Sequence, residues 1–448
     1  MCDGDRRMQE QAKRLGWEDL KKAMTEVPAL PISALYFFCL LCGYYLLRPV
    51  RDAFGASPEV EAVFPQWLIQ WSLAHGVALS DLTLQILFTG TFIAMLALQP
   101  IYGALVSRYP RRVFLPVVYG FFILCLVVFY ALFDMEIAGR GAAFFIWVAV
   151  FNLFAVSVFW SFMSDIYTEQ AARLFYSYIG FGGTLGAISG PLLTRLLSKH
   201  LEVSQLLLVS IFFLSVCLVC ILFLRRWAKH AEQLRQQNND DVAIGGSFWA
   251  GFRIVMSTPL LRAMAILMFF GVGVGTLLYN EQAIIAKQIL SGEARTAFYA
   301  NIDLWINGVT LFIQLFVAPF VLFRFGVKPL LLLPAAAITL GYCMLAAAPL
   351  PMLVAVVQIM TRAGEFSLSK PARETIYTRV DRETRYKAKA FIDTAIYRGG
   401  DLTFVWLHKF ISAFGSFTVF GVGILVALGM SFGAWKVAQQ QAKLQDER

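Results

Sequence analysis

The chain has 448 residues, of which 58% are hydrophobic and only 15% charged, and its formal net charge is +9. This composition excludes a soluble globular domain and a disordered chain of the same length. The basic residues lie in short loops between apolar runs, so the positive charge does not indicate a nucleic-acid partner. We expect a helical protein that crosses the lipid bilayer many times.

Residues 1–29 are polar, and six Lys and Arg lie among them. We predict a cytoplasmic amphipathic leader at the membrane surface, because the charged stretch is too long for a secretory signal. Twelve apolar segments follow, each near the roughly 20 residues that cross a hydrocarbon core. Their approximate ranges are 30–52, 82–106, 112–134, 142–166, 173–197, 205–225, 258–281, 300–323, 328–347, 351–371, 388–412 and 415–436.

One polar stretch, residues 230–257, interrupts the series after the sixth segment. We interpret it as a cytoplasmic linker that ends in a surface helix before Thr258. It separates an N-terminal six-helix bundle, 30–229, from a C-terminal one, 258–436, and a cytoplasmic tail follows at 437–448. The predicted fold class is an all-α membrane protein with twelve transmembrane helices in two pseudo-symmetric bundles.

The two halves repeat each other in sequence. The loop after the second segment reads SRYPRRVFLP, and the loop after the eighth reads FRFGVKPLLLLP. Gly182 and Gly183 in the fifth segment correspond to Gly399 and Gly400 in the eleventh. Such echoes indicate an internal duplication, and parallel six-helix repeats with a site between them are typical of secondary transporters.

The basic residues of the loops set the orientation. With the N-terminus inside, 26 Lys and Arg fall on the cytoplasmic side and five on the other. Positive loops stay in the cytoplasm, so both termini are predicted to be cytoplasmic.

Four charges lie inside the predicted spans. Arg362 and Glu365 are three residues apart in the tenth segment, and Arg398 and Asp401 repeat this spacing in the eleventh. Each charge facing lipid at the bilayer centre would cost about 2.5–3.5 kcal/mol, so they are expected to face protein or a wet cavity. Each pair either neutralises itself and joins two helices, or lines the path of a charged substrate.

Further charges gather near the ends of the spans. Arg48, Arg51 and Asp52 end the first helix, Glu281 ends the seventh, and Asp303 begins the eighth. Our hypothesis is that Arg48 or Arg51 pairs with Glu281 or Asp303 and closes the outer side. The alternative is that these are solvated charges at the membrane interface.

A second set of charges is predicted to close the inner side in the same way. It consists of Asp165 in the fourth helix and of Arg373 with Glu374 after the tenth.

Motifs for catalysis or metal binding are missing from the sequence. His75, His200, His230 and His408 are isolated, the seven Cys are scattered, and no GxxxxGK[ST] phosphate loop occurs. We therefore predict no enzyme activity, no metal site and no cofactor.

Several motifs resemble known transporters. GALVSRYPRRV (103–113) resembles the loop signature of the major facilitator superfamily, although Ser107 replaces the usual acidic residue. Four motifs are similar to those of the nucleotide (ATP/ADP) exchange translocases of plastids and intracellular bacteria, and the likeness is closest to their shorter free-living bacterial relatives. These motifs are YYLLRPVRD (44–52), FWSFMSD (159–165), RAGE (362–365) and KAKAFIDTAIYRGGD (387–401).

The resemblance implies a major facilitator fold and exchange of ATP for ADP and phosphate by alternating access, without hydrolysis. It implies a bacterial inner membrane, a small anionic solute as partner, and substrate or coupling roles for seven residues. These are Tyr44, Arg48, Arg51, Arg362, Glu365, Arg398 and Asp401. Guanidinium groups suit such a solute because they bind phosphate in a bidentate way.

The chain also departs from the classical exchangers, which carry a glutamate in the fourth helix where this chain has Val148 to Asn152. Two alternatives stay open. One is a proton-coupled carrier of another small solute, with Glu365 or Asp401 protonated in each cycle, and the other is a non-transporting membrane scaffold or sensor. The oligomeric state is open, with a monomer favoured.

Overall fold

The computed structural model describes residues 29–108, 111–167, 169–236, 248–289, 291–377, 384, 388–389 and 391–446. Within these ranges it does not describe the side chains of residues 99–108, 111–113, 164–165, 169–174, 177, 226–236, 248–250 and 443–446. The predicted leader, apart from Ala29, and much of the predicted linker therefore lie outside the described residues.

Six long helices form the first half of the chain. They are α3 (Ala29–Gly55), α6 (Thr83–Arg108), α7 (Arg111–Asp134), α8 (Arg140–Ile166), α9 (Glu169–Leu197) and α10 (Val203–Gln236). Three short elements connect α3 to α6, namely α4 (Val60–Val63), α5 (Gln66–Ala74) and the 3₁₀ turn η1 (Leu79–Asp81). A surface helix, α11 (Phe248–Ser257), leads into the second half.

The second half also has six helical segments, and three of them contain a π-helical turn. The uninterrupted ones are α12 (Pro259–Lys287), α15 (Val327–Ala347) and α20 (Ser416–Asp446). The others are α13 (Gly292–Phe312) with η2 (Ile313–Val317) and α14 (Ala318–Phe325), α16 (Pro351–Gly364) with η3 (Glu365–Ser369) and α17 (Lys370–Tyr377), and η4 (Ile392–Ile396) with α19 (Tyr397–Ser412).

Eight helices within the described residues are long and apolar enough to cross a membrane. One of the eight, Gly292–Phe325, runs through the π turn η2, so a π turn does not by itself exclude a span. Helices α16 and α19, which are not among the eight, have 14 and 16 residues and carry the charges of Arg362, Arg398 and Asp401. The described chain is helical without strands, which confirms the predicted all-α membrane fold.

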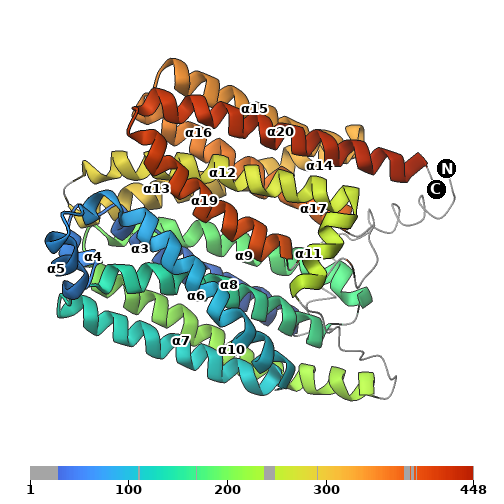
Figure 1. The fold of residues 1–448 in the computed structure, drawn as a ribbon. Coiled ribbons are helices and arrows are strands. Elements are labelled where there is room, and N and C mark those ends of the chain that lie inside the picture. The colour runs from blue at the N-terminus through green and yellow to red at the C-terminus, as the bar shows by residue number, and fades with distance from the viewer. Residues whose placement is uncertain are drawn as a thin grey trace.

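The two halves lie side by side, each around its own apolar core (Figure 1). Helices α6 and α9 of the first half pack against α19 and α13 of the second. A third apolar cluster joins the halves, in which Ala53 and Leu84 of the first half meet Tyr279 and Val405 of the second. The predicted pair of six-helix bundles is thus the observed architecture.

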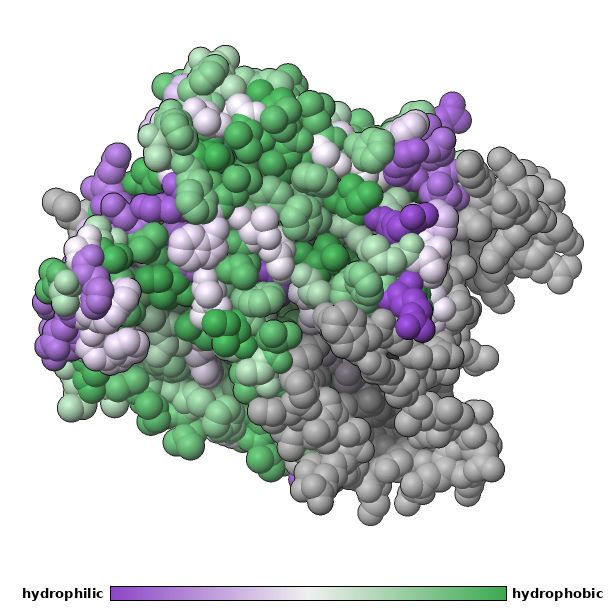
Figure 2. Space-filling view, viewed as in Figure 1, coloured by the Kyte–Doolittle hydropathy of each residue, from purple (hydrophilic) through white to green (hydrophobic). Residues whose placement is uncertain are grey.

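The outer surface of the helices is apolar over most of the face in Figure 2, and hydrophilic residues gather at its two ends. Phe121, Phe212, Phe316 and Phe323 are more than half exposed. Water would make such exposure unfavourable, whereas hydrocarbon accommodates it, so this belt faces the lipid.

Close packing of α9 on α3 fixes the helix that carries the first charges of the site. A Cβ added to Gly190 would lie 2.7 Å from the carbonyl oxygen of Cys42, so only glycine permits this approach. Gly186 faces the backbone of α3 in the same way, one turn earlier.

Candidate functional site

An ion pair between α3 and α13 joins the two halves. The Nη1 atom of Arg48 lies 3.2 Å from Oδ1 of Asp303, and the side chains are only 10% and 4% exposed. Arg48 also lies over the ring of Tyr45, 5.7 Å from its centroid. Of the partners offered by the sequence, the structure therefore places Asp303 against Arg48.

Asp52 makes a second connection between the halves. Arg51 donates to its Oδ1 atom from Nε at 2.8 Å, and Tyr279 of α12 donates its hydroxyl to the same oxygen at 3.0 Å. The guanidinium of Arg51 also lies 4.9 Å from the centroid of the Phe145 ring. Tyr279 did not emerge from the sequence, because 227 residues separate it from Asp52.

Further polar bonds cross between the halves at the same end of the molecule, which we call the closed end and define by α4 and α5 (Figure 1). The side chain of Gln85 donates to the carbonyl of Val405 at 3.2 Å, and Lys287 donates to the carbonyl of Ser80 at 2.6 Å. Together with the apolar cluster between the halves, these bonds hold α3 and α6 against α12 and α19.

Glu281, the other partner proposed for Arg48 or Arg51, lies elsewhere. Its Oε1 atom is 2.7 Å from Nε2 of His408, and both side chains are buried between α12 and α19. The expectation that His408 is isolated is wrong. Helix packing brings together two residues 127 positions apart, and the only signal in the sequence was a carboxylate at the end of an apolar run.

Arg398 and Asp401 pair with each other at the predicted spacing. Nη1 of Arg398 lies 3.2 Å from Oδ2 of Asp401, and Thr276 of α12 donates its hydroxyl to Oδ1 at 2.9 Å. The two side chains are 25% and 14% exposed, so the pair is not sealed in dry packing. Thr276 is a further contact that the sequence did not reveal.

Glu365 does not pair with Arg362, as its spacing suggested, but with Arg373. Nη2 and Nη1 of Arg373 donate to the two carboxylate oxygens at 2.5 and 3.2 Å. The helix widens into the π turn η3 at Glu365, which shifts the register that follows. The carboxylate is thereby held by a bidentate bond within its own half.

Arg362 is the arginine of the site whose guanidinium pairs with no carboxylate among the described residues. It forms no hydrogen bond or ion pair with any residue that the structure describes, and its Nε atom is buried without a partner. Its charge acts on Tyr45 of the first half and, in the second, on four residues: Asp303, Glu365, Tyr397 and Asp401. Arg362 therefore lies within electrostatic range of residues of both halves.

The residues proposed to close the inner side stay within one half in this structure. Arg373 bonds to Glu365, and Glu374 pairs with Lys389 at 2.6 Å. The side chain of Asp165 lies outside what the structure describes. A role in closing the inner side remains a prediction for these residues.

Tyr44, proposed for substrate binding, is 8% exposed and lies among aromatic rings. It makes an edge-to-face contact with Tyr45, with 5.1 Å between the ring centroids, and a tilted contact with Phe151. In this structure Tyr44 contributes to aromatic packing between α3 and α8.

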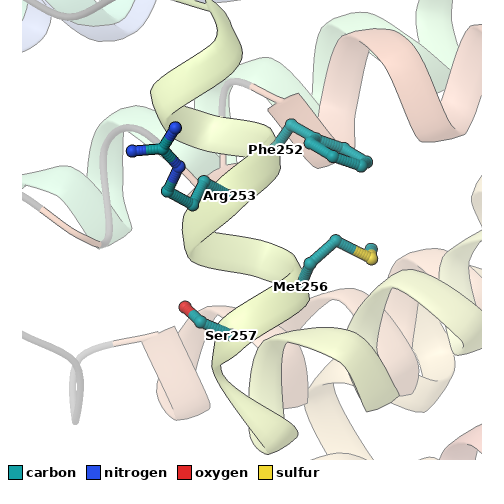
Figure 3. Close-up of a pocket in the computed structure, with 4 residues that line it drawn as sticks. All are labelled: Phe252, Arg253, Met256 and Ser257. Atoms are coloured by element: carbon teal, nitrogen blue, oxygen red, sulfur yellow. The ribbon is translucent and has the colours of Figure 1, made fainter.

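A cavity of about 590 Å³ lies elsewhere, on α11. Phe252 and Met256 point to one side of the helix, and Arg253 and Ser257 to the other (Figure 3). All four belong to one surface helix, so this hollow is separate from the charges between the halves. The described residues contain no group of three or more His, Cys, Asp or Glu that could hold a metal ion.

A helical membrane protein with two bundles and buried charges between them is organised as a secondary transporter. The sequence profile of the Major Facilitator Superfamily matches residues 35–400. The chain belongs to this superfamily, whose members are transporters rather than enzymes.

Among curated proteins, the chain is similar to ADP,ATP carrier protein 1 of Chlamydia trachomatis serovar D, with 23% identity over 88% of this chain and 85% of the relative. It is also 23% identical to the chloroplastic ADP,ATP carrier protein 1 of Arabidopsis thaliana, over 85% of this chain and 68% of the relative. These relatives confirm the resemblance to the nucleotide exchange translocase family.

Solved structures share the fold. A POT family transporter in complex with 5-aminolevulinic acid matches 90% of this chain and 95% of its own, with a TM-score of 0.61 and 13% identity. The nucleoside transporter NupG matches 91% of this chain and 98% of its own, with a TM-score of 0.55 and 15% identity. The protein is thus a multi-pass membrane transporter of the major facilitator type.

Proposed function

We propose that this protein exchanges nucleotides of the ATP and ADP type across a bacterial inner membrane by alternating access. In this proposal both termini lie in the cytoplasm, and the closed end faces outward. The relationship to ADP,ATP carrier proteins supports the substrate class. The distribution of Lys and Arg among the loops supports the orientation.

The observation that carries the proposal is the guanidinium of Arg362, which has no ion-pair partner among the residues that the structure describes. Arg48, Arg51, Arg373 and Arg398 each lie against a carboxylate, so the local charges nearly cancel. Arg362 adds a positive charge that no carboxylate in the described part of the chain pairs with. A phosphate group has the charge and the geometry to accept two parallel bonds from it.

The partly exposed pair of Arg398 and Asp401 lies within the electrostatic range of Arg362. A nucleotide carries several phosphate oxygens, so it has acceptors for more than one arginine. In the proposed site Arg362 binds a phosphate group first, and the arginines that are paired with carboxylates then bind further phosphate oxygens.

Transport by the full chain in proteoliposomes tests the proposal. Vesicles loaded with ADP are expected to take up labelled ATP, vesicles without internal nucleotide are not, and a proton uncoupler is expected to have no effect. Uptake of another solute that the uncoupler abolishes would overturn the proposal in favour of a proton-coupled carrier. No uptake of any solute in a panel would favour a scaffold or sensor.

Arg362 itself is tested by substitution. Arg362→Gln is expected to lower the rate of exchange at limiting ATP at least about 30-fold, the effect of removing one charged partner from a binding site. Arg362→Lys keeps the charge but loses the bidentate geometry, and its rate of exchange is expected to lie between those of the parent chain and Arg362→Gln. Arg253→Gln on α11 is the control, since it removes an exposed arginine away from the site. Equal losses in Arg362→Gln and Arg253→Gln would contradict a specific role.

A further inference from the structure

Arg48 is a proposed ligand of the substrate phosphate, and in this structure it pairs with Asp303, a carboxylate of the opposite half. The ion pair thus connects substrate binding with the contact between the halves. We infer that Asp303 and a phosphate group of the substrate compete for Arg48, so that substrate binding itself releases the closed end. The inference rests on the proposed function for the phosphate, and it adds a reason why transport is an exchange. The empty carrier keeps the pair and stays closed.

The negative charge of Asp303 is compensated mainly by Arg48. Its Oδ1 atom faces Nη1 of Arg48, whereas Oδ2 is buried and has no hydrogen-bond partner among the described residues. Arg51 and Arg362 act on it only through their charges. If Arg48 turns to another anion, Asp303 is left as a buried carboxylate with neither a hydrogen bond nor a close counter-ion, which is strongly unfavourable.

Separation of α13 from α3 relieves this penalty, because water then reaches Asp303. The two helices pack against each other at the closed end. The loss of a single partner therefore favours opening at that end. Asp52, whose Oδ2 atom lies 3.8 Å from Nε of Arg48, behaves differently, since Arg51 and Tyr279 still bond to it when Arg48 leaves.

The charges around Tyr45 connect Arg362 with this pair. The guanidinium of Arg48 lies over the Tyr45 ring, 5.7 Å from its centroid, and the charges of Arg48 and Arg362 both act on Tyr45. Asp303 lies within the electrostatic range of Arg362 as well. A polyphosphate that binds Arg362 thus brings a second anion to Arg48, in direct competition with Asp303.

The test reports opening of the closed end separately from transport. Ala286 is fully buried in the apolar cluster between the halves, so a cysteine at this position reacts with an impermeant maleimide only when that end opens. The labelling of the parent chain is subtracted from that of Ala286→Cys, which corrects for the native cysteines. It is measured in the full chain with and without ATP inside the vesicles, and efflux of labelled ADP into nucleotide-free buffer is followed in parallel.

In the Ala286→Cys chain we expect weak labelling that ATP increases. With Asp303→Asn added, we expect strong labelling without ATP and an efflux of ADP at least about tenfold faster. No carboxylate of the opposite half then holds Arg48, since its other carboxylate neighbour, Asp52 at 3.8 Å, lies on its own helix. Asp303→Glu keeps the carboxylate and is expected to restore most of the closure. Glu293→Gln, an exposed acid on the same helix, is the matched control and is expected to change neither readout.

The outcomes separate the inference from the proposed function. If the parent chain exchanges nucleotides but Asp303→Asn stays closed and tightly coupled, the competition for Arg48 is refuted and the exchanger stands. If no nucleotide is exchanged or bound, the proposed function fails, and phosphate cannot be the competitor. An increase in labelling by Asp303→Asn and Glu293→Gln alike would show a general loosening of α13, and would also overturn the inference.

Discussion

The charges of the closed end and those that follow α16 use the same residue types in opposite ways. At the closed end Arg48 and Asp303 come from different halves, and their side chains are 10% and 4% exposed. After α16 the partners share one half, and Glu365 is 30% exposed. A pair that crosses between the halves must break when they move apart, whereas a pair within one half moves as a unit. In our proposal, location rather than residue type thus distinguishes an ion pair that closes the outer side from one that stabilises a single half.

The largest effect is expected from Arg48→Ala. It leaves the carboxylate of Asp303 buried without its counter-ion, which costs about 3–5 kcal/mol of folding free energy. The midpoint of thermal unfolding in detergent should fall accordingly. The double variant Arg48→Ala with Asp303→Asn should regain much of the loss. A double variant as unstable as the single one would show that the pair does not stabilise the closed end.

Glu365→Gln is expected to have a smaller effect, about 2 kcal/mol, because the amide oxygen of glutamine still accepts a hydrogen bond from Arg373, whose side chain is 10% exposed. Since this pair lies within one half, labelling of Ala286→Cys should stay at the parent level. If labelling rises as is expected for Asp303→Asn, then ion pairs between the halves and ion pairs within one half do not differ in their effect on the closed end.

Tyr279→Phe removes one hydrogen bond to Asp52 across the halves. Bonds to charged groups contribute about 1.5–3 kcal/mol, and we expect the lower value because Arg51 still satisfies the carboxylate. This corresponds to roughly tenfold more of the open form. Labelling of Ala286→Cys measures it, and Tyr299→Phe is the control, since the Tyr299 hydroxyl has no hydrogen-bond partner among the described residues.

The smallest effect is expected from Lys389→Gln. Its pair with Glu374 is exposed, at 37% and 47%, and such pairs contribute about 0–1 kcal/mol. Thermal unfolding and exchange should both stay near the parent values. A large loss of exchange with unchanged unfolding would instead point to a role for Lys389 in closing the inner side.

The sequence predicted which residues belong to the site for many of its positions, but it predicted few of the contacts between them. The sequence singled out Arg362 because a charge inside an apolar run must face away from lipid, and it singled out Arg48 and Asp303 as charges near the ends of their spans. It also gave the local pair of Arg398 and Asp401, since three residues make nearly one helical turn. The same rule failed for Arg362 and Glu365, where a π turn begins.

Contacts across the chain were beyond this reasoning. His408 was expected to be isolated, yet it bonds to Glu281, and Tyr279 reaches Asp52 from the other half. Both contacts depend on how helices far apart in the sequence pack together, and no local spacing encodes that.

The sequence alone determined a membrane protein with two related halves, and it marked the charges buried between them. The reason is that a hydrocarbon core demands long apolar helices and tolerates a charge only where protein or water receives it. Only the tertiary structure decided which carboxylate holds which arginine, and which arginine is left unpaired. Those choices depend on the packing of α3 against α13 and on the register after each π turn, which are set by contacts between helices rather than within them.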